Sequence, residues 1–176
     1  MEAKIYVGTY SKYNAGSLFG QWIDLTKYSD KETFIEACQF LHNDEPDPEL
    51  MFQDYEGILH DMPKCWISES HISEEIFEFL EHFSDDEEKG KAFLNWVSFS
   101  GYSGDFHYLL SNFEEAYQGE FDSERAFAEH LADEMGWYAA MKKVGINECY
   151  FDEESYARDL FICDFTYSDG IVYRNL

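Results

Sequence analysis

The chain has 176 residues, enough for one domain with a sizeable core or for a few small ones, and it carries 37 acidic against 12 basic residues, a formal net charge of −25. Aromatic residues make up 19% of the chain, whereas disordered chains of high charge are poor in aromatics, so the protein is expected to fold. Its negative field repels nucleic acid and anionic membranes and favours basic partners or cations, DNA-binding proteins among them.

The first 61 residues predict a small α+β domain. Runs of β-branched and aromatic residues predict strands at Lys4–Tyr10, Leu18–Leu25 and Leu50–Glu56. Apolar residues at helical spacing predict a helix from Lys31 to about His42, which begins with a capping box of Ser29 and Glu32. Two prolines bar a helix from residues 43–49, so this stretch is expected to be a loop, and the helix is expected to pack on the strands.

Residues 62–104 predict an all-helical middle domain. The apolar stripe of its first helix consists of Ile72, Ile76, Phe79, Leu80 and Phe83. Ser84 and Glu87 form a second capping box, followed by a core stripe that includes Phe93 and Trp96. Gly101 and Gly104 are expected to close this domain with a flexible connection.

Residues 105–176 predict a second α+β domain. A helix from Asp105 to about Phe113 is expected to lead into a strand that ends at Glu120. Residues 123–135 predict a helix that is capped by Asp122 or Ser123 and ends at Gly136. Gly136–Gly145 is compatible with a further short helix, and Asp152 is expected to cap another that holds Tyr156, Ala157 and Leu160. Phe161–Tyr167 and Ile171–Arg174 flank the turn pair Asp169-Gly170 and predict a β-hairpin.

The predicted helix at residues 123–135 combines a core face with an acidic face. Phe127, Leu131 and Met135 fall four residues apart and are expected to face a core, with Ala128 and Ala132 beside them. Glu129 and Asp133 have the same spacing on a face that water covers. Like charges at this spacing weaken an isolated helix by a few tenths of a kcal/mol, so helix stability does not explain the repeat. A solubilising surface is the ordinary explanation, and a binding surface is the alternative.

No catalytic motif stands out. Asp85–Gly90 superficially resembles a calcium loop, but Lys89 occupies a ligand position and Trp96 stands where the bidentate glutamate belongs. Ser103 lacks the second glycine of a nucleophile elbow and is expected in a turn. The scattered histidines are expected to be surface or hydrogen-bonded core residues rather than metal ligands: His42, His60, His71, His82, His107 and His130. We therefore predict no enzyme activity, no metal and no cofactor.

The cysteine spacing and the hydropathy of the chain indicate the compartment in which the protein is expected. Cys38, Cys65, Cys149 and Cys163 lie far apart without a CxxC pair and predict buried thiols in a reducing cytosol, rather than disulfides or a zinc site. The chain starts with polar and charged residues, and no run approaches the roughly 18 apolar residues of a membrane span. A soluble, cytoplasmic protein is expected.

Four separate segments of the chain match the pattern of one known family. The first three are IYVGTYSKYNAGSLFGQWIDL near the start, DPELMFQDYEG at Asp47–Gly57 and the stretch Leu109–Gly136. The fourth, YFDEESYARDLFICDFTYSDGIVYR, lies near the end. Together they resemble ArdA-type antirestriction proteins: they occur in the right order and cover nearly the whole chain, most weakly between His60 and Tyr108. The family's antirestriction motif maps onto Leu109–Glu134, called here the motif stretch, in which Asp122 and Ser123 also match. Its expected core positions are Phe113, Ala116, Tyr117, Gly119, Phe127, Ala128 and Leu131, with Tyr117 partly exposed.

The resemblance implies a DNA mimic that binds type I restriction-modification enzymes, at their modification and specificity subunits, and blocks their access to DNA. Such proteins are carried on plasmids, conjugative transposons and phage-like elements. The resemblance also implies an elongated, curved homodimer of three small domains, here residues 1–61, 62–104 and 105–176. The main alternative from another class is an acidic adaptor that binds a different basic protein, such as a repressor or a nucleoid protein.

The net charge of the chain agrees with DNA mimicry. Duplex DNA carries about two charges per base pair, so 25 net charges match roughly 12 base pairs. A compact sphere could not present them as a line, so mimicry requires elongation, and the resemblance implies that the acidic surface is also curved. The candidate phosphate stand-ins are Glu74, Glu75, Glu78, Glu81, Asp85, Asp86, Glu87, Glu88, Glu114, Glu115, Glu120, Asp122, Glu129 and Asp133.

Overall fold

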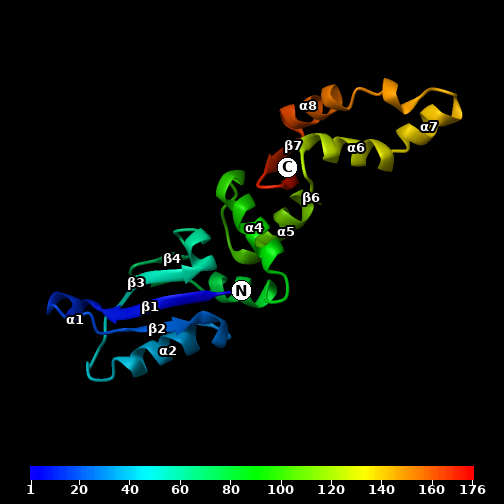
Figure 1. Ribbon diagram of the computed structural model, residues 1–176. Helices are drawn as coiled ribbons and strands as arrows, with labels where there is room; N and C mark the ends of the chain where they lie inside the picture. The colour runs from blue at the N-terminus through cyan, green and yellow to red at the C-terminus, as the bar shows by residue number, and fades with distance from the viewer. The chain divides into compact units, whose positions relative to one another are not determined.

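The structure is a computed structural model that describes all 176 residues, and the chain divides into two compact units, Met1–Leu109 and Leu110–Leu176 (Figure 1). Helices and small antiparallel sheets build the protein, which confirms the α+β class. The finer division into three domains, the elongated curved shape and the homodimer stay predictions. No helix is both long and apolar enough to cross a membrane.

The first unit combines a three-stranded sheet with helices. Its elements are β1 (Ala3–Thr9), α1 (Tyr10–Asn14), β2 (Gln21–Asp24), the 3-10 helix η1 (Leu25–Lys27), α2 (Lys31–Leu41), β3 (Leu50–Gly57), the 3-10 helix η2 (Ile58–Asp61), β4 (Ile67–Ser68), β5 (His71–Ile72), α3 (Glu75–His82), α4 (Glu87–Ser100) and the start of α5 (Phe106–Ala116). The sheet order is β2-β1-β3, all antiparallel. Phe34 of α2 is fully buried and its ring centroid lies 6.0 Å from that of Phe52 on β3, so the expected packing of helix on strands is confirmed.

A cluster of aromatic rings joins α3, α4 and the start of α5. Phe79, Phe83, Phe93 and Phe106 are buried, with ring centroids between 5.0 and 6.4 Å apart. Edge-on and tilted ring pairs at such distances are favourable because the ring edges are positive and the faces negative. The stripes predicted from helical spacing therefore form one core.

Two predicted helix caps are wrong by one or two residues, although α2 begins at Lys31 as predicted. The cap of α2 is Asp30, whose Oδ1 accepts a hydrogen bond from the Thr33 N–H at 2.8 Å, and not Ser29. The cap of α4 is Asp86, whose Oδ1 accepts from the Lys89 N–H at 3.0 Å, and not Ser84. An aspartate stands close after each serine and reaches the free amide three residues ahead, so it takes the capping role.

The middle of the chain is not wholly helical. β4 and β5 pair as a short antiparallel hairpin, so Ile72 contributes to the core from a strand and not from α3. β2 is also shorter than Leu18–Leu25, because the side chain of Asp24 accepts a hydrogen bond from the Thr26 N–H and so starts η1 at Leu25. Short local hydrogen bonds of this kind compete with strand pairing.

The second unit combines helices with a three-stranded sheet; α8 packs against α6 and β7, whereas α7 contacts α6 and η3. Its elements are the remainder of α5, β6 (Tyr117–Glu120), α6 (Glu124–Glu134), α7 (Trp137–Lys143), the 3-10 helix η3 (Glu148–Tyr150), α8 (Glu153–Cys163), β7 (Phe165–Ser168) and β8 (Ile171–Arg174). The sheet order is β6-β8-β7, and all pairs are antiparallel. Asp169 and Gly170 have φ of +51° and +83°, the two positive values that a type I′ turn requires, so the predicted hairpin is confirmed. Its first strand, predicted from Phe161, starts only at Phe165, because α8 continues to Cys163.

Phe127 of α6 centres the core of this unit. Its ring packs edge-on against Phe121, Phe161 and Phe165, with centroids 5.0, 5.8 and 4.8 Å away. Leu131 is partly buried against the same cluster. Met135, predicted to face the core, is 57% exposed: α6 ends at Glu134, and Gly136, with φ of +74°, turns the chain away.

The prediction that all four cysteines are buried is wrong. Only Cys38, on the inner face of α2, is buried, and burial raises the pKa of its thiol to about 12. Cys65, Cys149 and Cys163 are exposed, because they lie in a turn, in η3 and at the end of α8. All four are free thiols.

Candidate functional site: an acidic surface

The two faces of α6 differ in the way its sequence suggests. Ser123 Oγ accepts a hydrogen bond from the Ala126 N–H at 3.1 Å and fixes the start of the helix at Glu124. Phe127 and Ala128 are buried on the inner face. Glu129 and Asp133, one turn apart, are exposed. The helix therefore holds a pair of carboxylates at the surface from a rigid, packed element.

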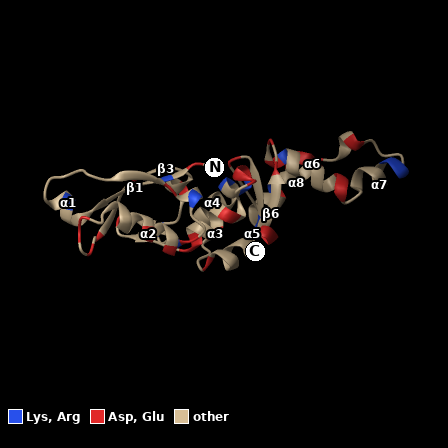
Figure 2. Cartoon of the chain, turned by 90° about the horizontal axis from the view of Figure 1, so that it is seen from below, with Lys and Arg blue, Asp and Glu red and all other residues tan.

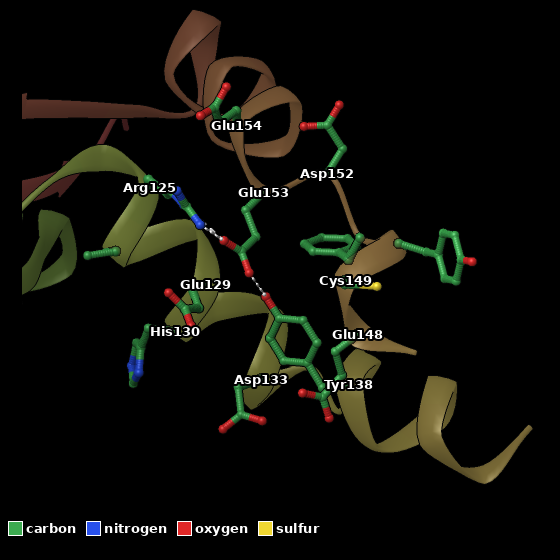
Figure 3. Close-up of a pocket in the computed structure, with 13 residues that line it drawn as sticks. Arg125, Glu129, His130, Asp133, Tyr138, Glu148, Cys149, Asp152, Glu153 and Glu154 are labelled. Atoms are coloured by element: carbon green, nitrogen blue, oxygen red, sulfur yellow. Dashed lines mark hydrogen bonds and ion pairs between the residues drawn. The ribbon is translucent and has the colours of Figure 1, made fainter. Parts of the chain in front are cut away.

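An acidic hollow of about 840 Å³ opens beside this helix (Figure 3). Side chains of α6, α7, η3 and the first turn of α8 line it. Its acidic residues are Glu129, Asp133, Glu148, Asp152, Glu153 and Glu154. Arg125 is the only lysine or arginine among the lining residues, so the hollow is strongly negative and attracts cationic groups.

One ion pair inside the hollow joins α6 to α8 (Figure 3). The Arg125 guanidinium donates from Nε and Nη2 to Glu153 Oε2 at 2.9 and 2.6 Å, and the Tyr138 hydroxyl donates to Glu153 Oε1 at 3.2 Å. The hydrogen bond to Glu153 raises the pKa of Arg125, and burial, followed by the charge of Glu153, raises the pKa of Tyr138 to about 12. Both groups therefore stay protonated near neutral pH. Glu153 links α8 to α6 and α7 through these bonds, whereas its neighbours Asp152 and Glu154 are exposed to solvent.

The core positions of the motif stretch are mostly buried. Phe113, Ala116, Phe127 and Ala128 are buried, whereas Tyr117, Gly119 and Leu131 are partly exposed. Phe113 packs against Tyr117 with ring centroids 5.3 Å apart. Gly119 has φ of +108°, a conformation that residues with a side chain rarely adopt. These residues mainly form the core of the second unit, whereas the acids of the motif stretch are exposed to solvent.

The candidate acids of the first unit lie on α3 and around the start of α4. Glu87 pairs with the N-terminal amine of Met1 at 2.9 Å and with Lys91 at 3.1 Å, and the amine is the main reason why the pKa of Glu87 is lowered. Glu88 also pairs with Lys91, at 3.0 Å. Glu78 lies 3.8 Å from the imidazole of His107. Part of this acidic group is therefore already balanced by local cations.

All fourteen candidate acids reach the surface. Eleven are exposed, and Glu75, Glu78 and Glu87 are partly buried. Lysines and arginines are few beside them (Figure 2). Six candidates in the motif stretch take part in no ion pair or side-chain hydrogen bond, and are called here the motif acids: Glu114, Glu115, Glu120, Asp122, Glu129 and Asp133. Their carboxylates are available to a partner.

The hollow includes acids that the sequence did not single out as binding residues. Of the fourteen candidates only Glu129 and Asp133 line it, and Asp152 was expected only as a helix cap. The run Asp152-Glu153-Glu154 was a detectable signal, but acids in a first helical turn ordinarily stabilise the helix end. The packing of α8 against α6 brings this run to the motif stretch, and spacing along the chain does not show that packing.

Asp152, one of the acids that line the hollow, provides a test of how the stability of this unit depends on pH. Its Oδ1 accepts from the Ser155 N–H at 3.0 Å, and this bond lowers its pKa. A lowered pKa means that the stabilisation is present above the unfolded value of about 3.9 and is lost as the pH falls through the folded value. We expect Asp152→Ala to lower the melting temperature at pH 7, and the difference from wild type to shrink at pH 3. Asp152→Asn, which keeps the capping oxygen, is the control, and an equal loss for both variants would contradict the capping role.

One group of side chains has the composition of a metal site. Ligand atoms of His42, Asp44 and Glu45 all lie within 4.8 Å of one another. His42 is the one buried histidine, and burial lowers the pKa of its imidazole. The other five histidines are exposed, and His42 is hydrogen-bonded in the core.

Comparison with known proteins agrees with the sequence resemblance. Residues 5–173 match a family model described as antirestriction protein (ArdA). The match extends through both compact units and contains the whole motif stretch and the residues that line the acidic hollow. No curated protein matches the chain.

Proposed function

Because the chain belongs to the ArdA family of antirestriction proteins, we propose that it is a DNA mimic that binds type I restriction-modification enzymes and blocks their DNA-binding groove. The modification and specificity subunits, which hold the DNA, are the proposed partners. An inhibitor of this kind acts by occupying a site and needs no catalytic residue. It would act in the cytoplasm, as a homodimer, to protect incoming DNA of a plasmid or conjugative transposon.

The observation that supports mimicry most is the set of motif acids. These six carboxylates are exposed at the surface, and only Glu129 lies near enough to an arginine, Arg125, to interact with its charge. Side chains four residues apart on a helix, such as Glu129 and Asp133, lie roughly 5 to 6 Å apart, close enough to present a dense row of charge to a basic groove. A protein groove that binds DNA phosphates through lysine and arginine would therefore meet a similar charge pattern here.

The total charge sets the length of DNA that could be imitated. Duplex DNA has about one charge per 1.7 Å of axis, so a homodimer with twice the charge of −25 would match roughly 25 base pairs. Such a match requires the charges to be spread along an extended dimer. A solution scattering profile would show whether the protein is an elongated dimer or a compact monomer.

The salt dependence of binding tests the proposal. Proteins that make six to ten phosphate contacts lose about 10³ to 10⁵ in affinity between roughly 50 and 200 mM salt, because counterions compete with the contacts. We expect the affinity of this protein for a purified type I enzyme to fall in the same direction, with a slope comparable to that of the enzyme's own DNA. Affinity that stays flat over this range would indicate an ordinary apolar interface.

The same complexes provide a competition control. Saturating cognate DNA should displace the protein from the enzyme, because both occupy one groove. A stable complex that holds enzyme, DNA and this protein together would contradict the mimic. Recovery of unrelated basic proteins, instead of modification subunits, from a host lysate would favour the acidic adaptor.

A further inference from the structure

The end of the N-terminal sheet carries a polar cluster that the acidic surface does not explain. His42, the residue after α2, is fully buried, and its Nε2 lies 3.3 Å from the carbonyl oxygen of Val7 on β1. A carbonyl oxygen only accepts hydrogen bonds, so Nε2 carries the proton and Nδ1 presents a lone pair. This lone pair faces the ammonium of Lys12, with Nδ1 and Nζ 3.0 Å apart.

Two carboxylates meet the same ammonium. Lys12 Nζ lies 2.7 Å from Asp44 Oδ1 and 3.2 Å from Glu45 Oε1. The Thr9 hydroxyl donates a hydrogen bond to Glu45 Oε1 at 2.7 Å and orients that carboxylate. One cation is thus surrounded by an imidazole nitrogen and two carboxylate oxygens, the donor set of many divalent metal sites.

The surroundings of the cluster also resemble those of a metal site. A ligating histidine almost always donates its other ring N–H to a carbonyl or carboxylate, and ligating carboxylates are themselves hydrogen-bonded. Val7 and Thr9 supply these two supports. An imidazole ligand suits zinc and related transition metals, whereas calcium and magnesium prefer oxygen alone.

We propose that His42, Asp44 and Glu45 form a binding site for a divalent transition-metal ion of the zinc class, and that the Lys12 ammonium holds the cation position when no metal is bound. Lys12 belongs to α1, a helix of only five residues, and its side chain, 15% exposed here, would turn out to solvent when the metal binds. Zinc-to-ligand distances of about 2.0 to 2.2 Å require the ligands to close in, which the 63% exposed side chain of Asp44 can do. The bound ion would join three residues of the loop after α2, of which His42 and Glu45 are already hydrogen-bonded to Val7 and Thr9 of β1. This site is independent of the proposed contact with restriction enzymes.

Zinc titration of three full-length proteins tests the site. We expect wild type to bind one Zn²⁺ in calorimetry, and Asp44→Asn/Glu45→Gln to lose that binding. Lys12→Met should bind Zn²⁺ at least about tenfold more tightly than wild type, because a like charge no longer competes for the position. Far-ultraviolet circular dichroism checks that each protein is folded. Zinc binding by wild type that survives Asp44→Asn/Glu45→Gln, or no zinc binding by wild type, would overturn the proposal.

The histidine ligand needs its own readout, since an acidic protein attracts cations in general. In ¹⁵N spectra of the imidazoles, Zn²⁺ should shift Nδ1 of His42 and leave the five exposed histidines unchanged. Mg²⁺ at the same concentration should leave the His42 signal in place. A zinc-induced shift confined to exposed histidines, or an equal response to Mg²⁺, would mean that the metal is only a counterion of the acidic surface.

Discussion

Replacing all six motif acids by their amides is expected to abolish inhibition of restriction while the protein stays folded. Each exposed ion pair with the enzyme should contribute about 0 to 1 kcal/mol, so a single change such as Asp133→Asn or Glu78→Gln should weaken inhibition only slightly. If the six changes act independently, they add to as much as about 6 kcal/mol, a loss of roughly 10⁴-fold in affinity, and coupling between neighbours such as Glu129 and Asp133 alters that sum. A restriction-protection assay beside thermal melts measures both properties. The melting temperature should stay the same or rise, because repulsion between like charges is relieved.

A matched control separates the position of the charges from their number. Six other exposed acids of the first unit, none of them a candidate, give the same change of net charge: Glu32, Glu36, Asp47, Glu49, Glu56 and Asp61. Their amide variant should keep most of the inhibition. Equal losses in the two variants would show that only total charge matters. A single acid whose replacement alone eliminated activity in a folded protein would refute distributed mimicry and favour an enzyme, since a catalytic acid is irreplaceable.

Phe127→Ala is expected to remove activity by unfolding the C-terminal unit. Phe127 is 3% exposed and contacts the rings of Phe121, Phe161 and Phe165. Replacing a buried phenylalanine by alanine costs about 3 to 5 kcal/mol. A unit of this size rarely has more than about 3 to 5 kcal/mol from its core, so the whole unit should unfold. Loss of near-ultraviolet circular dichroism and faster proteolysis after Leu109 should accompany the loss of inhibition.

Met135→Ala is the matched control on the same helix. Met135 is 57% exposed, although its spacing from Phe127 suggests a core position. Surface substitutions of this kind usually change stability by less than about 0.5 kcal/mol. The variant should therefore melt and inhibit like wild type. A Phe127→Ala protein with the wild-type melting temperature but no inhibition would instead make Phe127 a residue that contacts the enzyme.

Local features of this fold could be predicted because they depend on neighbours in the sequence. The cap at Ser123 needs only an acceptor three residues before a free amide, and the hairpin turn at Asp169-Gly170 needs only residues that tolerate positive φ. The helix caps at Asp30 and Asp86 show the limit of such rules. Where a serine and an aspartate both precede a helix, the sequence offers two caps, and the backbone geometry selects one.

The sequence by itself determined that this chain folds, that it is α+β, that its surface is acidic and to which family it is similar, since composition, periodicity and motif order are properties of the chain alone. Only the tertiary structure decided which charges stand together. Glu153 meets Arg125 and Tyr138, and Lys12 meets His42, across separations in sequence that no local rule connects. The physical reason is that a charge is felt over several ångströms of space regardless of its distance along the chain. The packing of α8 against α6 brings their acids together across this distance, and so forms the acidic hollow.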